Sequence, residues 1–377
     1  MGGDDPGPLA RLRHALRNPV PRFDSVKQLE IFLISAVVMI LVIRTQLWLT
    51  NYPQLGGGDL HIAHLLWGGL FMLIAIWFAL IYLNRWSRRV AAVLGGIGFG
   101  FFIDELGKFI TEDNDYFFRP AAPLIYLIFI VLFLVIREVS RRMEMSPSRA
   151  LANLLDLLPS TVTGEFGPKE KAAAEDLLER ADQDDPRVQA AREYLESVRL
   201  APVEPPSRFA RWLAGIGRWV TALTARSWFE AATVAVLIGW ALISLLGLFE
   251  VQYDLLGIQV TRETVPGTAG EVVDWGRALS MAASIVLVGV GTWRMLKGHH
   301  QAAYRAYSSA LLISIFITRV FSFLEIQFTA VFGLGADLLM LGAIAALAAR
   351  DREGSRFVGG YGAVGVSSGD GKEAAKA

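Results

Sequence analysis

The chain has 377 residues, 53% of them hydrophobic, and its mean hydropathy of +0.42 is high for a soluble protein of this size. Its net charge is zero, which argues against a nucleic-acid partner, because neutralising phosphates requires a basic surface. It contains no cysteine, so disulfides, thiolate nucleophiles and Cys-ligated metal centres are excluded.

A basic arm, residues 1–28, precedes the first apolar run, residues 29–50. That run is too long for the apolar region of a signal peptide, and no small-residue cleavage site follows it. We therefore expect a retained first membrane helix.

Seven further apolar runs follow, and each approaches or exceeds the ~20 residues that a helix needs to cross a ~30 Å hydrocarbon core. Together the runs predict an all-α integral membrane protein with eight transmembrane helices, four within residues 29–139 and four within residues 227–350. The runs are 29–50, 59–83, 89–111, 120–139, 229–250, 273–296, 304–326 and 328–349.

Loops rich in Lys and Arg alternate along the chain with loops that have few of these residues. Positively charged loops stay on the cytoplasmic side of a membrane. Basic clusters follow the second, fourth, sixth and eighth runs, whereas the opposite loops hold only Arg119 and Arg262. We expect a prokaryotic plasma-membrane protein with both termini in the cytoplasm. The clusters are Arg85, Arg88 and Arg89; Arg137, Arg141 and Arg142; Arg294, Lys297 and Arg305; and Arg350 and Arg352.

The two sets of four runs resemble each other. Residues 89–111 align without gaps with residues 303–325, and Asp59 and Asp274 each open the second run of their set. The pattern predicts a parallel 4+4 repeat, an arrangement common in transport proteins. The alternative is that apolar helices resemble each other through composition alone. The identities are Ala92/Ala306, Phe102/Phe316, Ile103/Ile317 and Phe109/Phe323.

A polar insert, residues 140–226, lies between the two sets. Ser146-Pro147 and Asp185-Pro186 are typical helix starts, because proline fits the first helical position. Apolar residues at helical spacing predict a small helical hairpin within residues 169–200. The insert is too small to be an independent enzyme, but it offers a surface for a cytoplasmic protein partner.

Two further segments have distinctive compositions. Residues 207–225 combine an aromatic-rich apolar face with flanking arginines, which favours a helix lying in the cytoplasmic headgroup region of the lipid bilayer. The alternative is a helix packed on the hairpin. The tail, residues 351–377, is rich in Gly, Ser and other small residues and is predicted to be disordered.

Histidines and carboxylates gather at the predicted outer ends of the second and third runs. His61 and His64, at spacing i and i+3, share one face of a helix. This set could hold one divalent metal ion, such as Zn²⁺, Mn²⁺ or Fe²⁺, or could bind protons or cations in a pore. The alternatives are hydrogen bonds of the histidines to headgroups and pairing of Asp104 with Lys108. The candidate ligands are Asp59, His61, His64, Asp104, Glu105, Asp113 and Asp115.

Other charges lie inside the runs, where an ionised group is costly and usually marks a partner or a functional cavity. The repeat alignment matches Glu105 with Arg319, so we expect these two side chains to pair between the halves. Small residues of the third run, from Gly95 to Gly100, should let neighbouring backbones approach closely. The candidate intramembrane charge partners are Arg44, Lys108, Arg277, Arg319 and Glu325.

A His at the start of one span followed by Asp-Glu near the end of the next resembles the layout of two families. These are the alkaline-ceramidase-like membrane hydrolases and, over the second to fourth runs, the VanZ-like proteins. The former family needs further His residues on a late helix, which the seventh and eighth runs lack. No family is therefore assigned to the whole chain.

Three classes of function remain. The first is a permease or channel for an ion or small solute, and the second is a metal-dependent membrane enzyme with an extracytoplasmic site. The third is a non-catalytic scaffold or sensor that acts through the insert. Transport sites usually lie near the midplane of the membrane, whereas these charges lie outward of it, which disfavours the permease. The short ligand set disfavours the enzyme. We take the permease or channel as the first interpretation.

Overall fold

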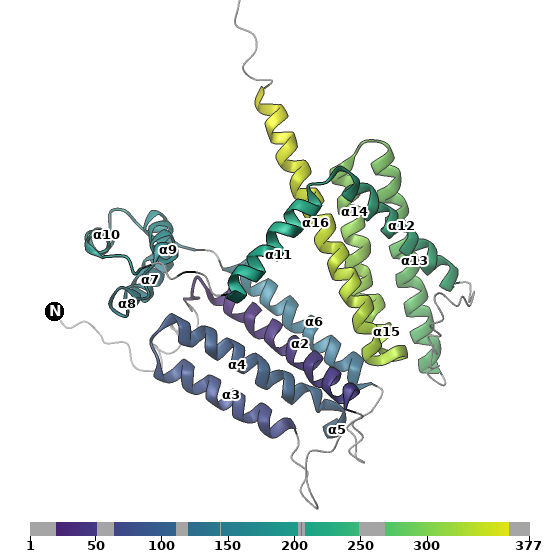
Figure 1. Ribbon diagram of the computed structural model, residues 1–377, viewed down its shortest axis with the longest axis horizontal. Helices are drawn as coiled ribbons and strands as arrows, with labels where there is room; N and C mark the ends of the chain where they lie inside the picture. Colours follow the sequence, from purple (N-terminus) through teal and green to yellow (C-terminus); the bar gives the residue numbers. More distant parts are fainter. Residues whose placement is uncertain are drawn as a thin grey trace, which may run out of the picture. The chain divides into compact units, whose positions relative to one another are not determined.

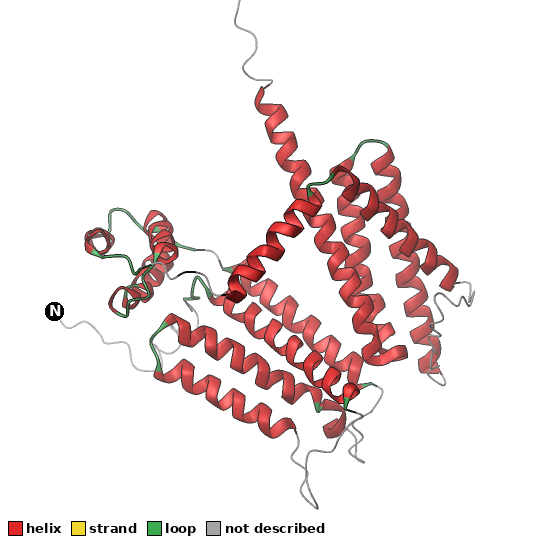
Figure 2. Cartoon of the chain, in the orientation of Figure 1, coloured by secondary structure: helices red, strands yellow, loops and turns green. Residues whose placement is uncertain are grey.

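The computed structural model describes residues 20–361 except 51–63, 111–119, 144, 203–204, 206–207 and 249–267. Within this part, the chain consists of helices joined by turns and short loops, and no strand is present (Figures 1 and 2). It divides into two compact units, Met1–Pro205 (unit 1) and Pro206–Ala377 (unit 2). This division falls inside the predicted insert, residues 140–226.

Unit 1 contains four long helices that pack side by side (Figure 1). Helix α4 lies along both α2 and α3, and α6 packs on α2. Many large apolar side chains on these helices are exposed, including Ile34 and Leu80, as expected for surfaces that face lipid. The helices are α2 (Ser25–Leu49), α3 (His64–Ile81), α4 (Arg85–Asp104) and α6 (Ala121–Arg142), with the short α5 (Leu106–Ile110) after α4.

Glycines bring α4 close to both neighbours. A Cβ atom on Gly96 would collide with the backbone oxygen of Phe32 in α2. On the other side of α4, a Cβ atom on Gly98 would lie 2.6 Å from the backbone oxygen of Gly68 in α3. Only a residue without a side chain permits these contacts, which confirms the predicted close approach.

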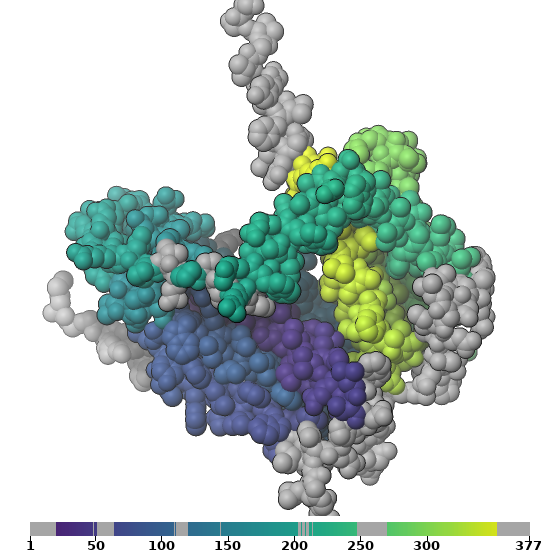
Figure 3. Space-filling view, in the orientation of Figure 1, coloured from purple at the N-terminus to yellow at the C-terminus, as the bar shows by residue number. Residues whose placement is uncertain are grey.

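The rest of unit 1 is a small helical body around a buried apolar core, and it forms a compact teal mass in the space-filling view (Figure 3). Its two predicted helix starts are confirmed. The hydroxyl oxygen of Ser146 accepts from the Arg149 N–H at 3.4 Å, and the Asp185 carboxylate accepts from the Arg187 N–H at 2.9 Å. Its helices are α7 (Pro147–Leu157), α8 (Pro159–Val162), α9 (Pro168–Arg180) and α10 (Pro186–Ser197).

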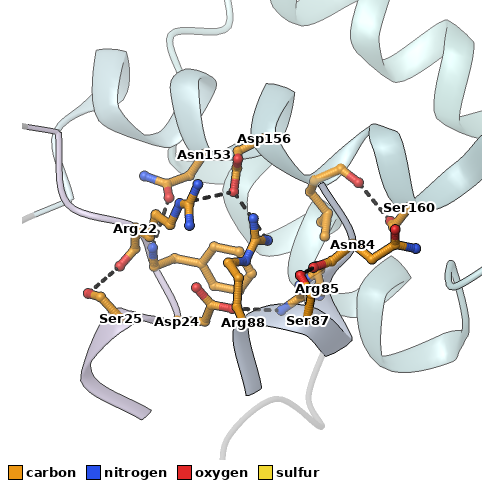
Figure 4. A network of polar contacts seen from close by, with 12 residues as sticks. Arg22, Asp24, Ser25, Asn84, Arg85, Ser87, Arg88, Asn153, Asp156 and Ser160 are labelled. Atoms are coloured by element: carbon orange, nitrogen blue, oxygen red, sulfur yellow. Dashed lines mark hydrogen bonds and ion pairs between the residues drawn. The ribbon is translucent and has the colours of Figure 1, made fainter. Parts of the chain in front are cut away.

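This body is attached to the membrane helices by a polar network (Figure 4). Asp156 of α7 lies between Arg22 and Arg88, at 3.7 Å and 3.5 Å. The buried Asn153 accepts from the backbone N–H of Phe23 at 2.8 Å and donates to the backbone oxygen of Pro21 at 3.1 Å. The body therefore binds the start of α2 and the start of α4.

The turn between α3 and α4 belongs to the same network. Glu165 accepts from the side chain of Asn84 at 2.7 Å and from the backbone N–H of Arg85 at 3.2 Å. The guanidinium of Arg85 also lies 3.3 Å from Asp24 and 3.4 Å from Glu170. Insert and membrane helices thus share ionic and hydrogen-bonded contacts at one end of unit 1.

Unit 2 contains a second set of long helices. Tyr307 and Leu311 of α14 are central to its core, together with Leu237, Val288 and Ile344 from three other helices. The helices are α11 (Arg208–Thr224), α12 (Ser227–Leu248), α13 (Thr268–Leu296), α14 (His300–Ile313), α15 (Arg319–Ile326) and α16 (Ala330–Tyr361). A π-helical turn, Ser314–Thr318, joins α14 to α15, and a 3₁₀ turn, Gln327–Thr329, joins α15 to α16.

The two units pack their helices in different orders. In unit 1 the neighbours run α3, α4, α2, α6, whereas in unit 2 they run α12, α13, α14, α16. The third long helix therefore lies between the first and second in unit 1, and between the second and fourth in unit 2. The predicted 4+4 repeat stays a prediction.

Six segments of the described residues are long and apolar enough to cross a membrane, as a polytopic membrane protein requires. The last of them, His300–Arg352, contains a turn at Gln327, which has a φ of 47°. Helix α4 is not among the six, because it begins with three arginines and ends with Asp104. The count of eight spans also stays a prediction. The segments are Ser25–Leu47, His64–Ile81, Ala121–Arg142, Ser227–Leu246, Gly270–Leu296 and His300–Arg352.

Candidate functional site

Three of the seven candidate ligands lie in the described part of the chain, and they share one end of unit 1. His64 begins α3, Asp104 ends α4, and Glu105 follows it. The opposite ends of α3 and α4 meet at the turn that binds the insert. The other candidates, Asp59, His61, Asp113 and Asp115, lie outside the described residues.

Asp104 faces α2 and binds Arg44. The Arg44 Nε atom donates to Asp104 Oδ1 at 2.7 Å, and Nη2 donates to the backbone oxygen of Asp104 at 3.3 Å. The residue Asp104 is 1% exposed, so this carboxylate is almost fully removed from solvent. An ion pair with a guanidinium offsets the cost of burying it.

Glu105 faces α3 and binds His64. Its Oε1 atom accepts from the backbone N–H of His64 at 3.1 Å and lies 3.4 Å from the imidazole Nδ1 atom. The imidazole stacks on the ring of Phe101, with 6.1 Å between ring centroids. Glu105 is 2% exposed, so the pair of side chains is held between α3 and the end of α4.

Helical periodicity explains why two consecutive carboxylates separate. Gly96 and Gly100 contact α2, and Asp104 continues that row at intervals of four residues. Gly98 and Phe101 contact α3, and Glu105 continues that second row. The expected cluster is therefore divided between two partners: Asp104 with Arg44, and Glu105 with His64.

The second oxygen of Glu105 distinguishes this carboxylate from the others. Oε2 is buried, and no hydrogen bond reaches it from the described residues. Lys108 Nζ lies 4.0 Å away, beyond hydrogen-bond distance but close enough for electrostatic attraction. Burying a carboxylate oxygen without a hydrogen-bond donor costs free energy. Such an oxygen can accept a proton or bind a cation.

The structure brings together too few ligands to define a metal centre. In the part of the chain that it describes, no group of three or more His, Asp or Glu side chains is placed to hold a metal ion. His64 and Glu105 would supply two ligands from the predicted set, whereas Asp104 is turned toward Arg44. The predicted divalent metal stays a prediction.

Within unit 2, Arg319 pairs with Asp337 of α16, and the expected pairing of Arg319 with Glu105 stays a prediction. The Arg319 Nε and Nη2 atoms donate to the two carboxylate oxygens of Asp337 at 2.7 Å and 3.0 Å. Ser314 adds a third hydrogen bond to Asp337 Oδ2 at 2.8 Å. Both partners thus belong to unit 2, while Glu105 finds His64 within unit 1.

Local backbone geometry favours the ion pair between Arg319 and Asp337. The π-helical turn directly precedes Arg319 and contains Ser314, and such turns occur often at functional sites. A Cβ atom on Gly333 of α16 would collide with the Arg319 guanidinium, so this glycine leaves the space that the guanidinium fills. A third ion pair joins Arg277 Nε of α13 to Glu325 Oε1 of α15 at 2.8 Å.

Sequence reasoning missed Asp337, although a signal was available. Asp337 lies inside the eighth apolar run, where an ionisable side chain is costly and should have a partner. It is 3% exposed in the structure and accepts three hydrogen bonds. The repeat alignment instead matched Arg319 with Glu105.

Comparisons of the chain with protein-family models, with curated proteins and with solved structures found no match.

Proposed function

We propose that this polytopic membrane protein is a permease or channel for an ion or small solute, and that His64 and Glu105 bind the transported proton or cation. In this proposal α4 is a membrane span despite its arginines, because it packs along both α2 and α3. Dividing His300–Arg352 at Gln327 then gives eight spans. The basic loops are cytoplasmic, so His64 and Glu105 are near the outer face.

The observation that carries the proposal is the buried carboxylate of Glu105. One oxygen is held by His64, and the other accepts no hydrogen bond from any described residue. Arg44, Arg277 and Arg319 each have a carboxylate partner, so those charges serve to stabilise the helix packing. Among the described candidate ligands, Glu105 and His64 lie together, and their chemistry allows reversible proton or cation binding at this depth.

Glu105 also has a structural role that the experiment must separate from ion binding. Its Oε1 atom accepts from the N–H of the first residue of α3, as a helix-capping side chain does. Glutamine keeps an oxygen that can accept this hydrogen bond, but it cannot take up a proton or carry a negative charge. Glu105→Gln therefore preserves the cap and removes the proposed site.

Flux through the purified protein in liposomes tests the proposal. Proton, sodium and potassium fluxes would be followed with internal fluorescent reporters under imposed gradients. We expect one of these fluxes in the wild type, its loss in Glu105→Gln, and an unfolding temperature in detergent close to that of the wild type. Glu138→Gln, at an exposed carboxylate on α6, is the matched control and should transport normally. Wild-type flux that is unchanged in Glu105→Gln would contradict the assignment.

The metal-dependent enzyme remains the second candidate, because His64 and Glu105 are two ligands of the predicted metal site and lie together. Elemental analysis of the detergent-purified protein separates the two proposals. A stoichiometric transition metal that is lost in His64→Ala would favour the enzyme. A metal-free protein with Glu105-dependent flux would favour the permease or channel.

A further inference from the structure

An apolar groove lies between α12 and α13 in unit 2, with a volume of about 400 Å³. Leu242 and Leu245 line it from α12, and Ile285, Gly289 and Trp293 line it from α13. Both helices contain segments long and apolar enough to cross a membrane, so the groove lies at the depth of the hydrocarbon core.

The groove offers almost no polar group to a ligand. Thr292 is the one polar side chain among the residues that line it apart from the Trp293 indole. Its hydroxyl donates to the backbone oxygen of Val288 at 2.9 Å and accepts from the Tyr307 hydroxyl at 3.2 Å. A ligand held here gains by burying hydrocarbon, and a polar ligand would lose its hydrogen bonds to water.

One end of the groove is marked by a basic side chain on an aromatic ring. Lys297 Nζ lies 4.0 Å from the ring centroid of Trp293, and Trp293 itself lines the groove. Trp and Lys at the end of a membrane helix are typical of the headgroup level, where anionic lipid attracts basic residues. Arg294, at the next position of α13, donates instead to the backbone oxygen of Ala302 at 3.5 Å.

From this juxtaposition we infer that the groove binds one acyl chain of an anionic phospholipid whose phosphate lies beside Lys297. The apolar walls of the groove bury the acyl chain, and the Lys297 ammonium attracts the anionic headgroup. This site is in unit 2 and does not depend on the proposed role of His64 and Glu105.

Two glycines give a matched pair of variants. A Cβ atom on Gly289 would meet no atom within 4 Å, so Gly289→Leu places its side chain into the groove without displacing the protein. Gly239 of α12 has equally open surroundings and does not line the groove, so Gly239→Leu is the control. Lys297→Gln removes the charge and leaves the groove intact.

The full chain, purified in a neutral detergent, would be titrated with phosphatidylglycerol or phosphatidylcholine of identical acyl chains and examined by native mass spectrometry. We expect the wild type and Gly239→Leu to bind one phosphatidylglycerol about fivefold more tightly than phosphatidylcholine, the effect of one basic residue at an anionic headgroup. Gly289→Leu should lose this bound lipid, and Lys297→Gln should bind both lipids equally.

Two results would overturn the inference. Equal binding of both lipids by the wild type would show that no anionic headgroup is selected. Binding by Gly289→Leu as tight as that of the wild type would show that the lipid is held elsewhere.

Discussion

At the scale of single residues, the charges inside the helices are organised as separate pairs. Asp104 binds Arg44, Asp337 binds Arg319, and Glu325 binds Arg277. In each pair the two side chains come from different helices, so each pair also fixes how two helices pack. Glu105 differs because one of its carboxylate oxygens is buried without a hydrogen bond from the described residues.

A double-mutant cycle tests the pairing of Arg319. Arg319→Gln and Asp337→Asn should each destabilise the protein, because each leaves a buried charge without its partner. The double variant should lose less than the sum of the two, with a coupling of about 0.5–3 kcal/mol. Thermal unfolding in detergent measures these losses.

Glu105→Gln combined with Arg319→Gln is the control for that cycle. Since Glu105 contacts His64 and Arg319 contacts Asp337, and since Glu105→Gln keeps the hydrogen bond to His64, this double variant should lose about as much stability as Arg319→Gln alone. Coupling between Glu105 and Arg319, with none between Arg319 and Asp337, would restore the pairing that the repeat alignment predicted.

At the scale of helices, α4 is held against two neighbours by glycines. Gly96 permits contact with α2, and Gly68 and Gly98 permit contact between α3 and α4. Association of helices in a membrane depends on such close packing, because lipid chains are as apolar as the side chains they compete with. The rigidity of this packing determines where Glu105 and His64 are placed.

Adjacent glycines on α3 give a direct comparison. A Cβ atom on Gly68 would lie 2.8 Å from the backbone oxygen of Gly98, whereas one on Gly69 would meet no atom within 4 Å. Gly68→Ala should therefore destabilise the protein by about 1–3 kcal/mol, the usual cost of overpacking. Gly69→Ala should leave stability unchanged or slightly higher, because alanine favours helix. Equal unfolding temperatures for the two variants would argue against the close contact of α3 with α4.

The helices and their starts were largely predictable from the sequence, whereas the partners of the charges were not. The length of the apolar runs identifies the membrane helices. Ser146 and Asp185, each followed by proline, predict the starts of α7 and α10. A four-residue period would also have separated Asp104 from Glu105, because Gly96 and Gly100 share a face with Asp104.

Helix neighbours, by contrast, depend on tertiary packing that no local pattern encodes. The repeat alignment assumed that equivalent helices pack equivalently. Instead, α4 packs between α2 and α3, whereas α14 packs between α13 and α16. Arg319 binds Asp337 on α16, whereas α6, the helix that the predicted repeat would match with α16, packs on α2.

At the scale of the whole molecule, the α7–α10 body of the insert is bound to the membrane helices of unit 1 and is not an independent domain on a free linker. Asn153 and Asp156 attach it to the start of α2 and to Arg88 of α4. These contacts lie at the end of α4 that is opposite Glu105. A cytoplasmic partner that bound the insert would thus act directly on the ends of the membrane helices.

Removing the Asn153 side chain tests this attachment. Asn153→Ala leaves the half-buried backbone N–H of Phe23 without its acceptor, at a cost of about 1 kcal/mol. The insert should then be cleaved faster by a soluble protease in limited proteolysis. Gln189→Ala, on the exposed face of α10, should be cleaved at the wild-type rate. Identical cleavage of both variants would mean that the network does not hold the insert.

The pair His64–Glu105 is proposed to face outward, at the end of unit 1 opposite the α7–α10 body. The natural chain has no cysteine, so single engineered cysteines report on sidedness without background labelling. The loops that flank the site in sequence can be labelled at Gly57 and Asn114, and the opposite side at the exposed residues Val162 and His299.

Labelling of these four cysteine variants with a membrane-impermeant maleimide on intact cells is the most direct measurement. We predict that cysteines at positions 57 and 114 react in intact cells, and that those at positions 162 and 299 react only after permeabilisation. The reverse pattern would place His64 and Glu105 in the cytoplasm. Labelling of positions 57 and 162 from the same side would contradict the membrane-spanning arrangement of unit 1.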